Sequence, residues 1–312
     1  MPPPLPKFFF SDSQPTSQGR LRVIRTLVGP VGLPHHRGRE LGVDSKSPIS
    51  PALEKCCLRM CAKTSYEQAS EDLEAIMGIK ISHSSLHRMV SRIEQPASLA
   101  EHPSEAMSVD GGKVCLRTEQ GSQWRDDKLI RLHGSVSEGF FQDPAGLQSW
   151  YAQQPRARLI TCLGDGHDGV WNVMEQLTQG VPICRQVLDW YHLKENLYKV
   201  GGSLKRLETV ESLLWHGWVE AAIAAFEGLN RLQAKRFQQY LRKHRHRLPD
   251  YRHYQRMGIP IGSGAVESKI KQVSARLKIS GARWRPENVP KMLRLRCAYL
   301  NRSSCLSIST AA

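Results

Sequence analysis

Three acidic residues stand where apolar runs of this sequence break off: Asp110 in Met-Ser-Val-Asp-Gly-Gly, Asp165 in Leu-Gly-Asp-Gly, and Glu267 in Gly-Ser-Gly-Ala-Val-Glu-Ser. A carboxylate at the end of a buried strand is costly to desolvate unless it is paired or binds a metal ion. Two Mg²⁺ ions about 3.5 to 4 Å apart prefer carboxylate ligands and can drive phosphodiester chemistry. The three acids therefore predict a site for two Mg²⁺ ions, with Mn²⁺ as a substitute.

Each of these acids also has a simpler interpretation. Asp110 and Gly111 form an Asp-Gly pair, which is favoured in hairpin turns. Asp165, between two glycines, also suits a turn or a helix cap. Glu267 would complement the amino terminus of a helix that starts near Gly264. The catalytic interpretation depends on the order of the three acids and on the sequence around each of them.

Other polar residues near these acids could also take part in a catalytic site. Asp189 and His192 form an Asp-x-x-His at an expected strand-to-helix junction, where they could bond within the first helical turn and support the site. Asp168 competes with Asp165, but its place before Gly-Val-Trp favours a helix cap. Ser263 lies in Gly-Ser-Gly, which lacks the strand-to-helix elbow of serine hydrolases.

The charge of the chain indicates a polyanionic partner. Its 312 residues carry 44 Lys and Arg against 29 Asp and Glu, a formal charge of +15. Residues 269–302 hold ten basic residues and one acid, Glu287, together with Trp284 and Tyr299. Such a stretch suits contact with a nucleic-acid backbone or, alternatively, a solvated helical face. The expected DNA contacts here are Lys269, Lys278, Arg283 and Arg285.

Cysteine spacing and hydropathy suggest an intracellular protein. None of the eight cysteines forms a Cys-x-x-Cys pair, so a zinc ribbon is not indicated, and several lie in apolar runs as buried thiols do. No apolar run reaches the roughly 18 residues that span a bilayer. We expect a cytoplasmic, nucleoid-associated protein without a membrane partner.

Helical periodicity begins near residue 50. Thr64 to Glu67 fits a capping box, Tyr66 to Met77 forms an apolar stripe, and Gly78 ends that helix. Ser82 can cap a second helix that shows small polar and basic side chains. The pair resembles a helix-turn-helix DNA reader, although an ordinary helical hairpin fits equally well. Its expected DNA contacts are Ser85, Arg88 and Arg92.

The middle of the chain predicts a sheet. Strands are expected at 106–110 and 113–117, joined by a Gly111-Gly112 turn, and at 128–136, 158–163 and 183–188. Three strands followed by strand-helix-strand-helix is the order of a ribonuclease-H-like mixed five-stranded α/β sheet. A helical block at about 203–248 is inserted before Glu267, and a last helix spans 286–300.

These patterns divide the chain into regions. Residues 1–49, rich in Pro, Gly, Ser and Arg, are expected to form a disordered tail or a remnant of a longer region. Residues 50–95 would form the helical DNA-binding region, 104–302 the catalytic domain, and 303–312 a flexible tail.

Several ordered blocks resemble the DDE transposases of bacterial insertion sequences, specifically the ISKra group. They are Asp110-Gly-Gly-Lys-Val, Leu163-Gly-Asp-Gly-His-Asp-Gly-Val-Trp-Asn, Leu188-Asp-Trp-Tyr-His-Leu-Lys-Glu-Asn-Leu and Gly258-Ile-Pro-Ile-Gly-Ser-Gly-Ala-Val-Glu-Ser, followed by Lys278-Ile-Ser-Gly-Ala-Arg-Trp, Asn288-Val-Pro and Arg296-Cys-Ala-Tyr-Leu. The resemblance covers about residues 50–301. It implies a ribonuclease-H-like core, a metal-dependent cut-and-join reaction, Asp110, Asp165 and Glu267 as the catalytic acids, and Asp189 with His192 as a family signature. The amino-terminal region departs from the family pattern.

The resulting hypothesis is a transposase that acts on the terminal inverted repeats of its own element and on target DNA, as a homodimer or larger assembly on paired ends. Two alternatives remain open. One is a catalytically inactive DNA-binding remnant, and the other is a nuclease or resolvase on the same ribonuclease-H-like sheet.

Overall fold

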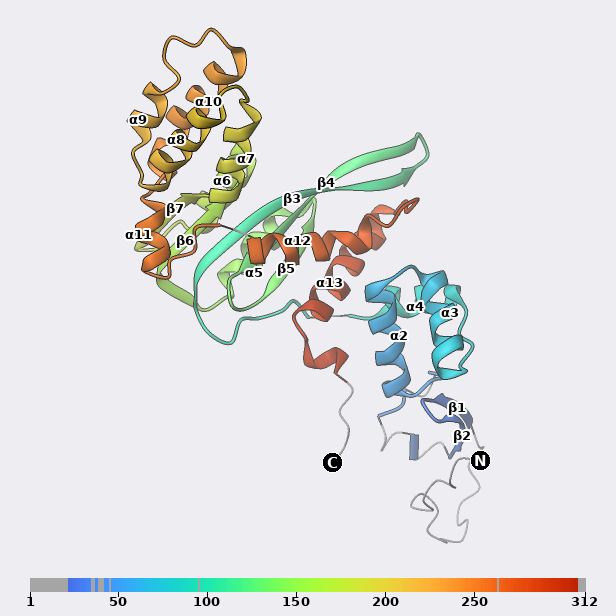
Figure 1. The fold of residues 1–312 in the computed structure, drawn as a ribbon. Helices are drawn as coiled ribbons and strands as arrows, with labels where there is room; N and C mark the ends of the chain where they lie inside the picture. Colours follow the sequence, from blue (N-terminus) through green and yellow to red (C-terminus); the bar gives the residue numbers. More distant parts are fainter. Residues whose placement is uncertain are drawn as a thin grey trace, which may run out of the picture.

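The structure, a computed structural model, describes residues 22–34, 37–38, 42–44, 46–94, 96–262 and 264–307, without the side chains of residues 264–270. Its centre is a mixed α/β unit around a five-stranded sheet in the order β5-β4-β3-β6-β7. Strands β3 (Ser104–Thr118), β4 (Gly121–Leu132) and β5 (Ser137–Phe141) are antiparallel. Strands β6 (Arg156–Gly164) and β7 (Ile183–Leu188) run parallel to β3. The predicted mixed five-stranded sheet is therefore present (Figure 1).

The boundaries of the antiparallel strands differ from those predicted. Gly111 and Gly112 lie inside β3, and the hairpin turn falls at Glu119 and Gln120. A Cβ atom on Gly112 would lie 2.5 Å from Oδ1 of Asp127 on the neighbouring strand. The glycine therefore makes room for a cross-strand side chain, and the expected turn was wrong.

The expected strand at 128–136 was also misplaced. Its second half is a turn, because β4 ends at Leu132 and His133 and Gly134 reverse the chain. Strand β5, which follows this turn, was not predicted.

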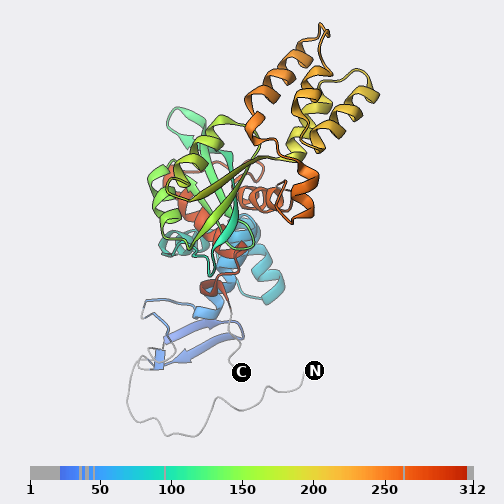
Figure 2. The ribbon, with the colours of Figure 1, turned by 90° about the vertical axis from the view of Figure 1, so that its left-hand side faces the viewer.

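Helices cover both faces of the sheet (Figures 1 and 2). On one face lie α5 (Pro144–Ala152) and α6 (Asp168–Leu177), in a core with Val109 and Ile130 of the sheet. On the other lie α12 (Gly264–Leu277) and α13 (Val289–Leu300), which contact β3, β4 and β5. Residues of β3, β4 and β5 thus serve two separate cores, according to the face on which they lie.

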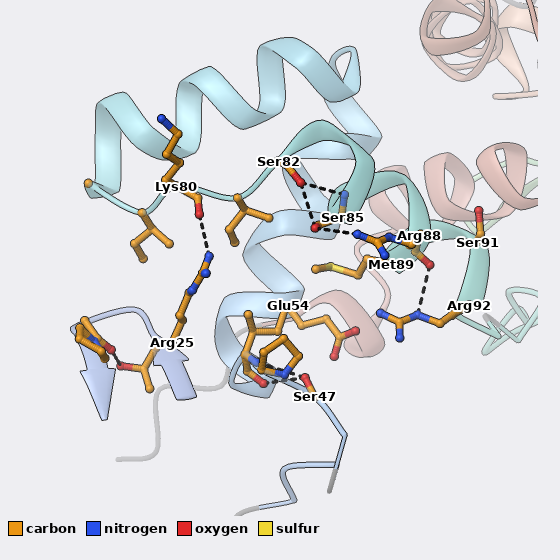
Figure 3. Close-up of a pocket in the computed structure, with 18 residues that line it drawn as sticks. Arg25, Ser47, Glu54, Lys80, Ser82, Ser85, Arg88, Met89, Ser91 and Arg92 are labelled. Atoms are coloured by element: carbon orange, nitrogen blue, oxygen red, sulfur yellow. Dashed lines mark hydrogen bonds between the residues drawn. The ribbon is translucent and has the colours of Figure 1, made fainter. Parts of the chain in front are cut away.

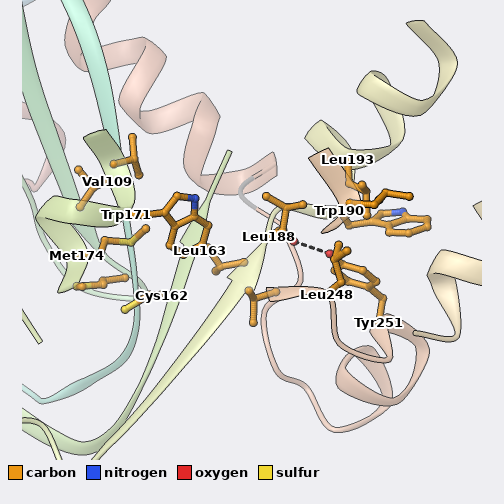
Figure 4. Close-up of a cluster of buried hydrophobic side chains, with 14 of the residues drawn as sticks. Val109, Cys162, Leu163, Trp171, Met174, Leu188, Trp190, Leu193, Leu248 and Tyr251 are labelled. Atoms are coloured by element: carbon orange, nitrogen blue, oxygen red, sulfur yellow. Dashed lines mark hydrogen bonds between the residues drawn. The ribbon is translucent and has the colours of Figure 1, made fainter. Parts of the chain in front are cut away.

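A helical block extends the first core beyond the end of β7. It comprises α7 (Trp190–Lys199), α8 (Leu204–Trp215), α9 (Val219–Ala224), α10 (Leu232–Lys243) and α11 (Tyr251–Arg256). The Tyr251 hydroxyl donates a hydrogen bond of 2.8 Å to the carbonyl of Leu188, and its ring packs on Trp190 (Figure 4). The insertion expected at about 203–248 therefore contains α8, α9 and α10, and its core is continuous with that of the sheet.

The amino-terminal part contains more regular structure than the sequence suggested. Strands β1 (Arg22–Thr26) and β2 (Gly29–Leu33) form a hairpin within the region expected to be a loose tail, and Ile24 is fully buried. The expectation for residues 1–21 lies outside the described residues.

Three helices follow this hairpin: α2 (Pro51–Lys63), α3 (Tyr66–Met77) and α4 (His83–Arg92). Ser65 caps α3 and Ser82 caps α4, while Gly78 ends α3 with a φ of 64°. The expected cap at Thr64 was one residue too early, because Thr64 ends α2.

Helices α2, α3 and α4 share one buried apolar cluster with α12, α13 and the β3–β4 hairpin. Arg276 of α12 is buried and donates to the carbonyl of Cys61, while Arg296 of α13 donates to the carbonyl of Ala62. The helical region is thus packed into the rest of the molecule. No helix among the described residues is long and apolar enough to cross a bilayer.

Candidate active site at the end of the parallel strands

Asp110 lies on the sheet face that is covered by α12. Asp110 lies four residues before Val114 on β3 and therefore on the same face, and Val114 belongs to the core under α12. Asp110 also pairs across the sheet with Leu129 of the same core. Its Oδ1 accepts a hydrogen bond of 2.7 Å from the backbone N–H of Gly111. Burial raises the pKa of Asp110, and Asp165 raises it further, whereas Lys278 and His192 lower it.

Asp165 lies directly after β6, beside Asp110. Ser108 of β3 pairs with Leu163 of β6. When this register is continued by two residues along each segment, Asp165 comes opposite Asp110. The Oδ1 atom of Asp165 accepts a hydrogen bond of 2.9 Å from the backbone N–H of His167. Because Asp165 also raises the pKa of Asp110, the structure brings these two predicted residues together.

Asp189 and His192 occupy the start of the next helix along the same sheet edge. Asp189 follows β7, is 1% exposed, and caps α7 by accepting from the backbone N–H groups of Tyr191 and His192. Its own N–H donates to the carbonyl of Gly164 at the end of β6. The predicted bonding within the first turn is present, and His192 faces Asp110 closely enough to lower its pKa.

The backbone before Glu267 returns to this edge after the insertion. The carbonyl of Ile261 accepts a hydrogen bond of 2.9 Å from the backbone N–H of Trp190. A Cβ atom on Gly262 would lie 2.5 Å from the ring of Tyr191, so a larger residue there would require this ring to move. Glu267 lies in the first turn of α12, but its side chain is outside the described residues. Its convergence on Asp110 and Asp165 remains a prediction.

Asp127 is a buried acid near this site that sequence reasoning missed. It lies on β4 opposite Gly112, is 1% exposed, and has two carboxylate oxygens without a hydrogen-bond partner among the described residues. Burial raises its pKa, Lys278 lowers it, and Asp110 raises it. The available signal was the glycine pair in the facing strand, which marks the close approach of a side chain.

Lys278 is exposed, as expected of a DNA contact, and it lies near enough to the site to influence its acids. It follows the end of α12, and its ammonium lowers the pKa of both Asp110 and Asp127. The other expected DNA contact on this helix, Lys269, has a side chain outside the described residues.

Of the two residues set aside by sequence reasoning, Asp168 has another role and Ser263 lies outside the described residues. Asp168 is the first residue of α6, and the cap is His167 instead, which corrects the expected assignment. The exposed Asp168 carboxylate forms an ion pair of 2.6 Å with Lys243, which lowers its pKa. Ser263 lies outside the described residues.

The predicted helix-turn-helix contacts line a hollow of about 920 Å³ between α4 and the β1–β2 hairpin (Figure 3). Arg88 donates to the hydroxyl of Ser85, and Arg92 donates to the carbonyl of Arg88. Arg25 enters from the hairpin and donates to the carbonyl of Lys80. Ser85, Arg88 and Arg92 thus lie on one side of α4, with a third guanidinium nearby.

The basic carboxyl-terminal stretch is used partly for internal contacts. Arg283 and Arg285 are exposed, as expected of DNA contacts. Trp284 between them is buried, and it exchanges backbone hydrogen bonds with Cys115 and Arg117 of β3. The side chain of Trp284 is therefore part of the protein core, whereas the arginines on both sides of it are exposed.

Comparisons with known proteins identify no family for this chain. No protein-family model matches it, and no curated protein matches it. Among the described residues, no group of three or more His, Cys, Asp and Glu is arranged to hold a metal ion. The described geometry of the candidate site consists of the Asp110–Asp165 pair, Asp189 and His192 beside it, and the buried Asp127.

Proposed function

We propose that the chain is a transposase that cleaves DNA at the ends of its own insertion sequence and joins those ends to target DNA. The observation that carries this proposal is the juxtaposition of Asp110 and Asp165 on adjacent parallel strands. The order of strands and helices is compatible with a ribonuclease-H-like fold. The sequence blocks that resemble DDE transposases contain both aspartates.

The donor set fits a hard divalent cation. Asp110 and Asp165 each use one carboxylate oxygen to accept a local backbone N–H, and no hydrogen bond is made by the other oxygen among the described residues. Two like charges held side by side favour a divalent cation between them. When bound, two Mg²⁺ or Mn²⁺ ions would activate an oxygen nucleophile and neutralise the leaving oxygen.

The roles of the protein's own residues follow from their positions. Asp110 and Asp165 would hold the metals jointly, and Glu267, in the first turn of α12, would complete the second site. Asp189 fixes the start of α7 beside them, and His192 contributes positive potential when protonated. After hydrolysis at the element end, the freed 3′-OH would attack a target phosphodiester. Pairing two ends requires at least two copies of the chain.

The test is Mg²⁺-dependent cleavage of duplex DNA that carries the natural sequences on both sides of the reading frame. We expect Asp110→Asn, Asp165→Asn and Glu267→Gln each to abolish strand cleavage while DNA binding remains nearly intact. Asp168→Asn is the matched control, because this exposed carboxylate lies three residues from Asp165 and pairs with Lys243. That variant should cleave as the wild type does.

The alternatives predict different products. An inactive remnant would bind the DNA ends with a steep salt dependence and would break no strand in Mg²⁺ or Mn²⁺. A nuclease or resolvase would cleave structured DNA without end sequences and without joined products. Full activity of Glu267→Gln would refute the assignment of the third acid.

A further inference from the structure

Two glycines flank Asp165, and each one leaves room for an aromatic side chain. A Cβ atom on Gly164 would lie 2.8 Å from the ring of Trp171, which belongs to α6. A Cβ atom on Gly166 would lie 2.7 Å from the hydroxyl oxygen of Tyr240, which belongs to α10. Glycine in such a position marks the close approach of another group to the backbone. The backbone on either side of Asp165 is therefore in contact with an aromatic side chain.

Tyr240 also forms a hydrogen bond with the backbone of Asp165. Its hydroxyl donates a hydrogen bond of 3.4 Å to the carbonyl of Asp165. Asn196 of α7 forms a hydrogen bond with the same hydroxyl. Burial raises the pKa of Tyr240 to about 12, so the hydroxyl keeps its proton at neutral pH and remains a donor.

The ring of Tyr240 is itself packed against buried neighbours. Its centroid lies 4.7 Å from that of His244, edge to face, and 6.2 Å from that of Phe237. His244 is 0% exposed and Phe237 is 4% exposed. A side chain that is fixed by packing in this way can fix the group to which it donates a hydrogen bond.

The position of the Asp165 carboxylate depends on this part of the backbone. Its Oδ1 atom accepts a hydrogen bond from the backbone N–H of His167, only two residues further along the chain. A change in the backbone at Asp165 and Gly166 would therefore also move the carboxylate relative to Asp110.

We propose that Tyr240 is a positioning residue, which fixes the backbone of Asp165 at the end of β6 and so keeps the Asp165 carboxylate beside Asp110. The helical insertion then contributes to the candidate site through α10. The inference rests on the proposed function only for the role of the two aspartates in binding a metal ion. It assigns Tyr240 no contact with metal or DNA.

The first test measures amide hydrogen exchange of the full chain in metal-free buffer. The reporter is the backbone N–H of His167, because it donates to the Asp165 carboxylate. Tyr240→Phe keeps the ring and removes only the hydroxyl. Exchange at His167 should become about fivefold faster, the factor that corresponds to one ordinary hydrogen bond. Amides in the middle of β6 should exchange as they do in the wild type.

The second test measures Mn²⁺ binding to the full chain, without DNA, by titration calorimetry. Tyr240→Phe should weaken Mn²⁺ binding by about fivefold, because binding must then also supply the free energy that fixes the Asp165 backbone. Lys243→Gln is the matched control, since this exposed residue lies one turn further along α10 and pairs with Asp168, close to Asp165. Exposed ion pairs contribute little, so this variant should match the wild type in both tests.

A cycle of thermal midpoints in metal-free buffer tests the contact between Tyr240 and Gly166. Gly166→Ala introduces a Cβ atom whose nearest neighbour is the Tyr240 hydroxyl. The strain of an alanine at a φ of 94° is the same with and without this hydroxyl. Gly166→Ala should therefore lower the midpoint less in the Tyr240→Phe background than in the wild type, and additive shifts would reject the contact.

Three results would overturn the inference. They are an unchanged exchange rate at His167 in Tyr240→Phe, an unchanged Mn²⁺ affinity in that variant, and losses of the same size in Lys243→Gln. The proposed function is tested separately in the same titration, where Asp110→Asn should remove Mn²⁺ binding. Retained binding in Asp110→Asn would reject the metal site and would leave the exchange result, which is obtained without metal, unaffected.

Discussion

At the scale of single residues, buried acids divide into those that surround the candidate site and those that serve the core. Asp110 and Asp127 share a sheet face, and Lys278 lowers the pKa of both. Glu138 of β5 is instead 3% exposed among core residues, where it accepts a hydrogen bond from the backbone N–H of Ser98 and contacts the Cys297 thiol. Burial raises its pKa to about 7.

Glu138 should make the stability of the protein depend on pH. Its folded pKa of about 7 lies above the ordinary value of 4.5, so the folded state binds this proton more tightly than the unfolded state does. This contribution to stability is complete below about pH 4.5 and is lost as the pH rises through 7. Glu138→Gln should remove that loss and make the protein more stable than the wild type at pH 8, by about 3 kcal/mol.

Urea unfolding of both proteins between pH 5 and 8 provides the measurement. The difference between the two curves isolates Glu138 from His133, whose pKa burial lowers to about 4. A difference that stays constant over this range would contradict the assignment.

At the scale of elements, α12 is tied at both ends. Its entry is fixed by the bond between Trp190 and Ile261, and the segment after it is fixed by the bonds of Trp284 to β3. Near its end, the buried guanidinium of Arg276 donates to the carbonyl of Cys61 and packs over the rings of Tyr66 and Trp284. These contacts position the helix that carries Glu267.

Arg276→Ala should therefore destabilise the protein by about 2 kcal/mol, the range for a hydrogen bond to a charged group. Arg283→Ala is the matched control, since this exposed arginine seven residues later should change stability by less than about 0.5 kcal/mol. Chemical denaturation of the two variants provides the comparison. Equal effects would mean that Arg276 does not anchor α12 to α2.

The success of sequence reasoning differed between elements for physical reasons. Strand β7 was predicted to the residue, and β6 nearly so; the second half of β6 is the buried apolar run that is typical of a central parallel strand. The Gly111-Gly112 pair led to a wrong prediction of a turn, because the space that it leaves is filled by the side chain of Asp127 on β4. Asp127 was missed because the glycine pair that makes room for it was interpreted as a turn.

For the candidate site, too, sequence reasoning predicted some features and missed others. The proximity of Asp110 and Asp165 followed from the expected order of strands, and in the structure both lie two residues beyond the paired residues Ser108 and Leu163. The inward position of Arg276 did not follow, because the basic stretch gave no indication of which of its residues are buried. Arg276 is 3% exposed, whereas Lys278, two residues later, is exposed.

At the scale of the whole molecule, the amino-terminal helices and the sheet form one packed unit. The apolar cluster that joins them contains Leu58 and Cys61 of α2 together with Met292 and Leu295 of α13, all fully or almost fully buried. The expected boundary near residue 95 therefore separates segments of sequence but does not separate hydrophobic cores.

A fragment that begins at Pro96 should consequently fail to fold cooperatively. Removal of α2, α3 and α4 would leave the apolar face of α13 exposed to water. We expect a broad thermal transition and strong binding of a hydrophobic dye, with the full chain as reference. A fragment that melts sharply at the midpoint of the full chain would show that the catalytic part folds alone.

The backbone bond between Trp190 and Ile261 brings together the two ends of a 72-residue excursion, from 190 to 261. The chain therefore leaves the sheet and comes back at nearly the same place. Helices within this excursion could lengthen, shorten or be exchanged during evolution without displacing the acidic cluster. Helix α10 is the exception, because its Tyr240 hydroxyl donates a hydrogen bond of 3.4 Å to the carbonyl of Asp165.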